Sequence, residues 1–237
     1  DLLNDFTTLE TQNQIIKVVG RIVGYRNQGS LVFADLKDGS GKIQLVIKKE
    51  NIKDFELFRN NLDIGDFVGI AGSLFKTQKG EKSIEVKNLK LLAKNLRPLP
   101  DQWSGLSDVE NRLRHRYLDI LMNAGVREIF LKKALFWETI RNSLKKQNFL
   151  EVETPVLELI PGGADAEPFI THHNALDTDF YLRISLELPL KKLLVAGYEK
   201  VFEIGRVFRN EGIDAEHLQD YTECEFYWSY QDYKGLM

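Results

Sequence analysis

The stretch "FEIGRVFRNEGIDAEHLQDYTECEFYW", residues 202–228, places a densely charged segment between two apolar ones. Its two ends alternate apolar and polar residues with a period of two, which predicts two β-strands joined by a polar loop. Glu225 and Tyr227 then point to the same face of a sheet. If that face lines a cleft, these polar groups serve recognition rather than stability.

The two arginines of this stretch, Arg206 and Arg209, allow two interpretations. A guanidinium group grips a phosphate or a carboxylate through paired hydrogen bonds, so either arginine could hold a ligand. Either could instead form a surface ion pair with Glu203 or Glu211, which contributes little stability. The polar face of the return strand favours the ligand interpretation.

The composition indicates a globular protein with a substantial core. The 237 residues are 43% hydrophobic and 28% charged, which is enough for two ordinary domains. The chain has no apolar run long enough to cross a bilayer, no signal-peptide pattern and a single cysteine, Cys224, so we expect a cytoplasmic protein without a membrane partner. Residues 1–100 carry 16 Lys and Arg against 12 Asp and Glu. This mild excess could meet a polyanion or be ordinary scatter.

The first hundred residues alternate in the manner of a small barrel. This part of the chain predicts strands at 15–25, 31–36, 43–47, 67–75 and 84–92, with a helix at 52–62. Three strands, a short helix and two strands is the order of an OB-fold, although another small barrel or sheet would show the same pattern. We predict an all-β OB-fold domain over residues 1–95.

A segment with two prolines, 96–106, is typical of a linker, and residues 107–237 are predicted to form a second domain. Ser107 and Glu110 predict a capping box that starts a helix ending near Leu121. Short strands alternate with loops and helices further along, which predicts an α+β domain with an antiparallel sheet.

A longer helix is predicted from Val126 to about Asn148. Its apolar residues recur at helical spacing and predict one buried face. That face comprises Val126, Ile129, Phe130, Trp137, Ile140 and Leu144.

The charged stretch and its surroundings resemble class II aminoacyl-tRNA synthetases. "FRNEGIDAEH" (208–217) followed by "YTECEFY" (221–227) is similar to motif 2 of that class, two antiparallel strands that carry the ATP site. The long helix with "FLEVETP" (149–155) resembles motif 1, the dimer-forming element that ends at a proline, here Pro155.

Other segments are similar to lysyl-tRNA synthetases in particular. "THHNALD" (171–177) and "YLRI" (181–184) are close to that family's wording. "FADLKDGSGKIQL" (33–45) and "KTQKGEKSIEV" (76–86) resemble its anticodon-binding OB domain. The resemblance covers nearly the whole chain and implies an OB-fold barrel followed by part of a class II catalytic domain.

The resemblance assigns roles to individual residues. Arg209 would hold the α-phosphate of ATP and the carboxylate of the amino acid. Glu211 would face adenine or the acceptor end of tRNA, His217 would approach the outer phosphates, and Tyr221 would stack on adenine. The implied lysine pocket comprises Gly163, Glu187, Arg209, Glu225 and Tyr227. The implied anticodon contacts are Phe33, which would stack on a base, and Arg26, Gln44 and Glu81, which would bind base edges.

The implied activity is that of a lysine–tRNA ligase, with ATP, lysine and tRNA(Lys) as substrates and a homodimer as the intact enzyme. Lysine would be activated as an adenylate and then transferred to the 3′ end of the tRNA. Motif 3, with its second ATP-binding arginine, and the acidic ligands of Mg²⁺ have no counterpart up to Met237. We therefore expect a longer full-length enzyme, no metal site within these residues, and little activity from them alone.

Several alternatives remain at this point. The chain could be a non-catalytic tRNA-binding paralogue, or an aspartyl- or asparaginyl-type synthetase with the same OB domain and motif 2. Phe33 could fill the barrel, and Glu81 could be a solvated loop residue. The adjacent His172 and His173 invite a metal interpretation, but we expect them to be structural because no Cys or Glu lies around them at ligand spacing.

Overall fold

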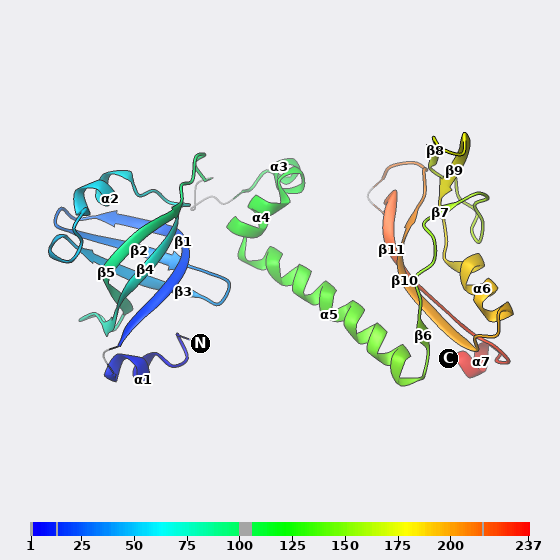
Figure 1. The fold of residues 1–237 in the computed structure, drawn as a ribbon, viewed down its shortest axis with the longest axis horizontal. Helices are drawn as coiled ribbons and strands as arrows, with labels where there is room; N and C mark the ends of the chain where they lie inside the picture. The colour runs from blue at the N-terminus through cyan, green and yellow to red at the C-terminus, as the bar shows by residue number, and fades with distance from the viewer. Residues whose placement is uncertain (1, 13, 100–105, 215) are drawn as a thin grey trace. The chain divides into compact units, whose positions relative to one another are not determined.

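The computed structural model describes residues 2–12, 14–99, 106–214 and 216–237. By its internal contacts the chain divides into two compact units, residues 1–124 and 125–237, which we describe separately. Figure 1 shows the elements of each unit.

The first unit contains a closed barrel whose strands follow the order β1-β2-β3-β5-β4. All neighbouring strands pair antiparallel except β3 and β5, which pair parallel. The predicted strands and the predicted helix are confirmed, with ends that differ by a few residues. The strands are β1 (Ile15–Asn27), β2 (Leu31–Lys37), β3 (Lys42–Lys48), β4 (Phe67–Lys76) and β5 (Lys82–Ala93). The helices are α1 (Phe6–Thr11), the 3-10 turn η1 (Lys49–Asn51) and α2 (Phe55–Asn61).

The barrel core forms because alternate strand residues point inward and are apolar. Val32, Ala34 and Leu36 of β2 are buried, whereas the residues between them are only half-buried. Helix α1, which the sequence did not predict, places Phe6 in this core with none of its surface exposed.

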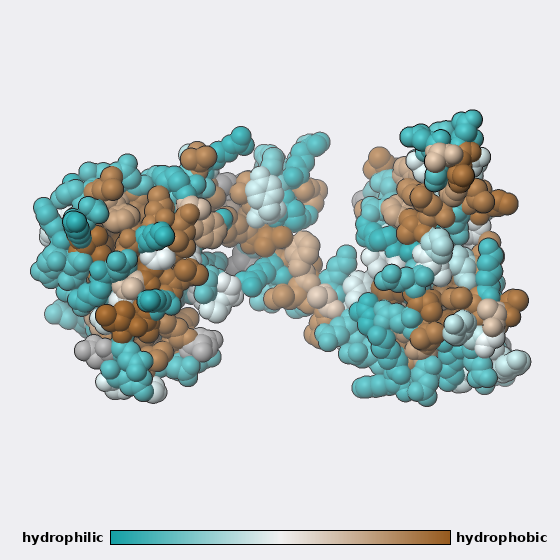
Figure 2. Space-filling model, in the orientation of Figure 1, coloured by the Kyte–Doolittle hydropathy of each residue, from teal (hydrophilic) through white to brown (hydrophobic). Residues whose placement is uncertain are grey.

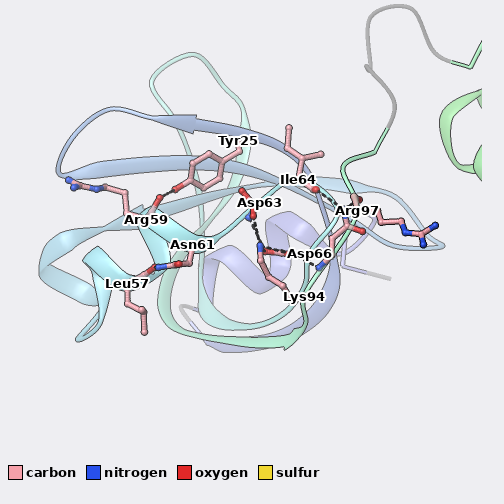
Figure 3. A network of polar contacts seen from close by, with 10 residues as sticks. Tyr25, Leu57, Arg59, Asn61, Asp63, Ile64, Asp66, Lys94 and Arg97 are labelled. Atoms are coloured by element: carbon pink, nitrogen blue, oxygen red, sulfur yellow. Dashed lines mark hydrogen bonds and ion pairs between the residues drawn. The ribbon is translucent and has the colours of Figure 1, made fainter.

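A buried carboxylate fastens the end of β5 to the start of β4 (Figure 3). Asp66 is fully buried and accepts hydrogen bonds from the Asn95 and Asp63 N–H groups at 2.7 and 2.8 Å and from Lys94 Nζ at 2.9 Å. Burial raises the pKa of Asp66, but these hydrogen bonds and the Lys94 charge outweigh it and hold the pKa below its usual value. These contacts anchor the chain to the barrel as far as Asn95.

Two short helices complete the described part of the first unit, α3 (Val109–Arg114) and α4 (Arg116–Met122). The predicted capping box was wrong by one residue: Asp108 is the N-cap, and its carboxylate accepts from the Asn111 N–H at 2.8 Å. The predicted single helix is broken at His115, which leaves the helical conformation. Residues 100–105 of the predicted linker lie outside the described residues.

The second unit has the predicted α+β character, and its described strands form two small, largely antiparallel sheets. In one, β10 pairs antiparallel with β11 and parallel with β6; in the other, β9 pairs antiparallel with β7 and β8. The strands are β6 (Leu150–Glu151), β7 (Leu157–Glu158), β8 (Ile170–His173), β9 (Thr178–Leu182), β10 (Lys200–Phe208) and β11 (Asp220–Trp228). The helices are α5 (Ala124–Lys146), α6 (Glu187–Val195) and α7 (Tyr233–Leu236).

The β10–β11 hairpin is packed differently on its two faces. On one face Phe202 packs with Leu144 at the end of α5 and with Phe149. On the other, Val201 and Val207 pack with Leu186 and Leu190 of the α6 segment. The hairpin is thereby held between two apolar clusters, and its polar residues are positioned by strand register.

Helix α5 buries only part of its predicted apolar face. Leu144 is buried and Ile140 packs beside it, but Ile129 and Phe130 are 64% and 47% exposed. The prediction of one buried face was therefore wrong for the middle of the helix. Figure 2 shows apolar surface on both units among hydrophilic side chains.

Candidate functional site

The polar face of the hairpin is set by the pairing of β10 with β11. Every second residue of β11 points to the same face, and these residues are Tyr221, Glu223, Glu225 and Tyr227. Residues that lie opposite one another in an antiparallel pair also share a face. Glu225 lies opposite Glu203, so both carboxylates project from the face that α6 also contacts. The predicted sharing of one face by Glu225 and Tyr227 is confirmed.

Glu225 is held by three hydrogen bonds. Its Oε1 accepts from the Ser185 hydroxyl and from the Leu186 N–H, each at 2.9 Å, and its Oε2 accepts from the Tyr227 hydroxyl at 2.9 Å. Burial, together with this hydrogen bond and the Glu225 charge, raises the pKa of Tyr227 far above its usual value, so its phenol remains a donor. A carboxylate fixed in this way is ready to receive a cation.

Gly163 and Glu187 lie close to the same group of residues. Gly163 has a φ of +88°, and a Cβ there would lie 2.9 Å from both the Glu187 Cβ and the Ser185 hydroxyl. The Glu187 N–H donates to the Ser185 hydroxyl at 3.0 Å. Ser185 thus links Gly163, Glu187 and Glu225. Sequence reasoning missed it, although a small hydroxyl residue just before a helix was a usable signal.

An ammonium group of the chain itself already lies in this region. Lys191 Nζ is 2.7 Å from Glu187 Oε1 and 5.8 Å from the centre of the Tyr227 ring. The pair is half-exposed and lies at i and i+4 on α6, so it contributes little stability and a competing ammonium could replace it. The surroundings of Glu187 therefore suit a primary amine.

The loop between β10 and β11 surrounds a cavity of about 260 Å³. Its lining brings together four predicted ATP-site residues. The lining residues are Arg209, Glu211, Gly212, Glu216, His217, Leu218, Gln219 and Tyr221.

Arg209 is half-buried, and its backbone N–H and its Nε are both hydrogen-bonded. The backbone N–H of Arg209 donates to the Gln219 carbonyl at 2.8 Å, and the side-chain Nε donates to the Ile184 carbonyl at 3.4 Å. Its guanidinium lies 5.4 Å from the centre of the Tyr221 ring. Among the described residues no carboxylate forms an ion pair with Arg209, whereas Arg206 pairs with Asp220 at the surface. The ion-pair interpretation therefore applies to Arg206, with a partner that was not predicted.

His217 is oriented by Asp214 within the loop. The ring Nδ1 of His217 lies 2.7 Å from Asp214 Oδ2, and the backbone N–H of His217 donates to Asp214 Oδ1 at 2.8 Å. The hydrogen bond from the Glu216 N–H has the largest effect on Asp214 and that from His217 the next largest, and both hold the pKa of Asp214 below its usual value. Because the carboxylate holds Nδ1, the other ring nitrogen of His217 is left to meet a ligand.

The same face holds a buried ion pair that sequence reasoning missed. Arg183 and Glu203 are each 4% exposed, and Arg183 Nη1 lies 2.6 Å from Glu203 Oε1. Glu203 Oε2 accepts from the hydroxyl and the N–H of Thr154 at 2.7 and 3.1 Å. Glu203 therefore supports the segment before Pro155 rather than pairing with Arg206 or Arg209. Pro155 itself lines a groove of about 880 Å³ next to Thr154.

The barrel brings two predicted anticodon residues, Arg26 and Phe33, together on its outer face. Phe33 is half-buried between the inward Val32 and Ala34, so it does not fill the barrel. Arg26 lies opposite Phe33 on the neighbouring strand. Arg26 Nη2 is 3.8 Å from Asp35 Oδ1, and Asp35 in turn lies opposite Gln44.

The other two anticodon candidates, Gln44 and Glu81, lie on β3 and in the β4–β5 loop. Gln44 accepts from the Ser83 hydroxyl at 3.0 Å. Glu81 is exposed in the β4–β5 loop, where its N–H donates to the Thr77 hydroxyl at 3.0 Å. Glu81 precedes Ser83 by two residues in the sequence, and Ser83 lies opposite Gln44 in the pairing of β3 with β5.

The histidine pair lies on the β8–β9 hairpin. His172 Nδ1 is 3.0 Å from Asp179, and the His173 ring lies 5.2 Å from that of Phe180. Within the described ranges, no three His, Cys, Asp or Glu side chains gather in a way that could hold a metal ion. Nor does any helix in the described part of the chain combine the length and apolarity needed to cross a membrane.

Comparison with known proteins gives this hairpin a family. Residues 108–237 match the family described as "tRNA synthetases class II (D, K and N)", and residues 16–92 match the "OB-fold nucleic acid binding domain". The chain belongs to the class II tRNA synthetase family, and the predicted OB-fold followed by a class II domain is confirmed.

Relatives within this family are named "Lysine--tRNA ligase". One from Moorella thermoacetica is 51% identical over 230 residues, which are 96% of this chain and 47% of the relative. Those from Thermoanaerobacter pseudethanolicus and Pelotomaculum thermopropionicum are each 48% identical over 100% of this chain and 47% and 46% of their own lengths. The chain spans about half the length of the curated relatives it matches.

Proposed function

We propose that the protein is a lysine–tRNA ligase, which joins lysine to the 3′ end of tRNA(Lys) at the expense of ATP. The observation that carries this proposal is the Glu225 carboxylate, oriented by Ser185, Leu186 and Tyr227, on the same hairpin as Arg209, whose guanidinium forms no ion pair with a carboxylate among the described residues. Relatives named "Lysine--tRNA ligase" support it.

In the proposed first step the lysine carboxylate attacks the α-phosphorus of ATP, the bond to the β-phosphate oxygen breaks, and pyrophosphate leaves. Arg209 bridges the attacking carboxylate and the α-phosphate, because a guanidinium can serve two oxygen acceptors at once. Tyr221 stacks on adenine beside Arg209, His217 meets the outer phosphates, and Glu211 meets adenine or the acceptor end. The residues act by alignment and by neutralising charge.

In the second step a terminal ribose hydroxyl of the tRNA attacks the acyl carbon, and AMP leaves with the bonding electron pair. No covalent enzyme intermediate is required. Mg²⁺ would neutralise phosphate charge when bound. We propose that its ligands come from outside this chain, because the described residues offer no cluster that fits an ion.

Selection of lysine over aspartate follows from the charge of the pocket. Glu225 and Glu187 present carboxylates where a side chain would enter, and Gly163 keeps the space beside Glu187 and Ser185 free of a side chain. An acidic substrate would meet like charges, and a neutral one would leave the carboxylates unpaired, at a cost of about 1–3 kcal/mol or more. This charge pattern disfavours the aspartyl or asparaginyl alternative.

For the barrel we propose a role in binding the tRNA anticodon. Phe33 offers a ring on the outer face, with Arg26, Gln44 and Glu81 around it as edge contacts. Stacking with edge hydrogen bonds is how single-stranded RNA is read. We assign residues 1–95 to this domain, 96–106 to a linker and 107–237 to the catalytic domain, supported by family matches at 16–92 and 108–237. A cytoplasmic location suits a translation enzyme.

We also propose a homodimer, formed through α5 and the segment around Pro155. The middle of α5 exposes a run of large apolar side chains, which a monomer rarely leaves in water. They are Ile129, Phe130, Leu131, Leu135 and Phe136. Light scattering after gel filtration tests this: Phe130→Glu is expected to shift a dimer toward monomer.

ATP–pyrophosphate exchange tests the function. The protein expressed from its complete reading frame is expected to exchange with lysine and not with aspartate or asparagine. Glu225→Gln is expected to raise the KM for lysine by about 10–100-fold, since it removes a charge-assisted hydrogen bond. Exchange driven by aspartate would overturn the lysine assignment, and tRNA binding without exchange would favour the non-catalytic paralogue.

A further inference from the structure

Arg183 holds the chain on both sides of Pro155. Its backbone N–H donates to the Val156 carbonyl at 2.9 Å, and its Nη1 donates to the Thr154 carbonyl at 3.1 Å. Pro155 lies between these two partners and has no N–H with which to make such a bond itself. Because Arg183 is only 3% exposed, water does not compete for these contacts. The chain before and after Pro155 is therefore fixed to Arg183.

The same residue also holds β10 just before Arg209. The Arg183 carbonyl accepts from the Phe208 N–H at 2.9 Å, and the Arg183 Nε donates to the Arg206 carbonyl at 2.8 Å. Strand β6 pairs with β10 at residues 201–202, further from Arg209, so Arg183 supplies the partners of these later backbone groups. The backbone that leads into Arg209 is thus positioned by Arg183.

The guanidinium of Arg183 reaches its partners with different nitrogens at the same time. Nε donates to the Arg206 carbonyl, whereas Nη1 donates to Thr154 and to Glu203 Oε1. Nη2 lies against Gly205, where a Cβ would clash with it. A guanidinium presents its donors in one rigid plane, while lysine presents a single nitrogen on a flexible stem. A lysine in this place would keep the ion pair with Glu203 but lose the bond to the Arg206 carbonyl.

The residues that follow Arg183 contact the proposed site directly. The Ile184 carbonyl accepts from Arg209 Nε at 3.4 Å. The hydroxyl and the N–H of the next two residues each donate to Glu225 Oε1 at 2.9 Å. Because residues 183–186 are consecutive, a displacement of Arg183 shifts the groups that orient Arg209 and Glu225.

We propose that Arg183 is a positioning residue of the proposed ligase. By joining the segment around Pro155 to the end of β10, it places the Arg209 guanidinium correctly with respect to the Glu225 carboxylate. The inference rests on the proposed function, and it gives a role in the reaction to a residue that contacts neither lysine nor ATP. Such a residue acts on the rate, because a misplacement of about 1 Å in a site lowers the rate by about 100-fold.

Arg183→Lys tests the proposal, because it keeps the positive charge beside Glu203 and removes the bond to the Arg206 carbonyl. Glu203→Gln is the matched comparison, since it removes the charge of the pair and leaves Arg183 with the Arg206 and Thr154 carbonyls. ATP–pyrophosphate exchange on the protein expressed from its complete reading frame gives kcat and the KM values for lysine and ATP. Urea unfolding gives the stability of each variant, and the kinetics are measured at a temperature where each variant is folded.

The expected result separates the rate from the stability. Both variants unfold at a lower urea concentration than the unmodified protein. Arg183→Lys lowers kcat by about 10–100-fold while each KM changes less than about threefold, because the groups that contact the substrates remain. Glu203→Gln changes kcat and both KM values less than about threefold, because Arg183 keeps its backbone partners.

Gly205→Ala is the second variant, and it decides the question if Arg183→Lys does not fold. Its methyl group crowds Arg183 Nη2 and leaves every hydrogen-bonding group in place, so kcat is expected to fall about tenfold. An unchanged kcat in a folded Arg183→Lys or Gly205→Ala variant overturns the proposal. An equal loss of kcat in Glu203→Gln also overturns it, because the pair would then act through stability alone. Failure of the proposed function differs, because the unmodified protein would then show no lysine-dependent exchange.

Discussion

The buried pair Arg183–Glu203 is expected to be the most sensitive ionic contact of the second unit. Replacing Glu203 by Leu removes the counter-charge that lies 2.6 Å from Arg183 Nη1, and both side chains are only 4% exposed. The guanidinium keeps neutral acceptors: the Arg206 carbonyl at 2.8 Å and the Thr154 carbonyl at 3.1 Å. Thr154 loses the acceptor for its hydroxyl and its N–H.

The size of the loss follows from these contacts. Breaking a buried pair from one side costs about 3–5 kcal/mol, because the remaining charge stays buried. Glu203→Gln keeps an acceptor for Thr154 and replaces charge-assisted hydrogen bonds by neutral ones, so about 1–3 kcal/mol is expected. Against a typical domain stability of about 5–15 kcal/mol, Glu203→Leu lowers the melting temperature by roughly 10 °C or more.

Urea unfolding followed by the fluorescence of Trp228 and Trp137 measures these changes in the second unit. The double variant Arg183→Met with Glu203→Leu removes both charges, so its cost is expected to fall at least about 2 kcal/mol below the sum of the two single variants. Two outcomes would refute the reasoning: single variants that each cost less than about 1 kcal/mol, or a double variant equal to the sum of the singles.

Three further changes follow from the structure. Gly205→Ala would place a Cβ 2.3 Å from Arg183 Nη2, so we expect a loss of about 1–3 kcal/mol in urea unfolding. Gly163→Ala forces a side chain onto a φ of +88° inside the proposed pocket, so the KM for lysine should rise about tenfold or more in the exchange assay. Hydrogen bonds from Lys48 and Lys87 lower the pKa of Glu85 to about 2. As the pH falls, Glu85 therefore binds a proton in the unfolded chain before it does so in the folded one. Thermal melts followed by circular dichroism should show the barrel losing stability from about pH 4.5 down to about pH 2. The Glu85→Gln variant should lose less stability over this pH range.

Features that depend on local alternation could be predicted from the sequence. The barrel strands were predictable because inward positions such as Ala34 and Leu36 are apolar while Asp35 between them is polar. The shared face of Glu225 and Tyr227 follows from the same period of two. Both patterns depend only on residues within one strand, so they can be predicted without knowing which distant residues contact that strand.

Features that depend on distant partners could not be predicted. Glu203 pairs with Arg183, twenty residues earlier, only because the end of β9 comes to lie beside β10. The parallel pairing of β6 with β10 likewise depends on how the chain returns after α5. The exposed middle of α5 has the same periodicity as a buried face, since periodicity shows which residues are apolar and not what covers them.

Hydrogen bonding separates the residues of the hairpin that hold the fold from those available to a ligand. Glu203 is satisfied by Arg183 and Thr154, so its polar atoms need nothing from outside the chain. Glu225 is fixed by three donors yet remains a carboxylate open to a cation, as expected of a group that orients a substrate. Arg209 and Glu223 differ from both, because within the described residues the first has no carboxylate partner and the second keeps a buried oxygen without a donor.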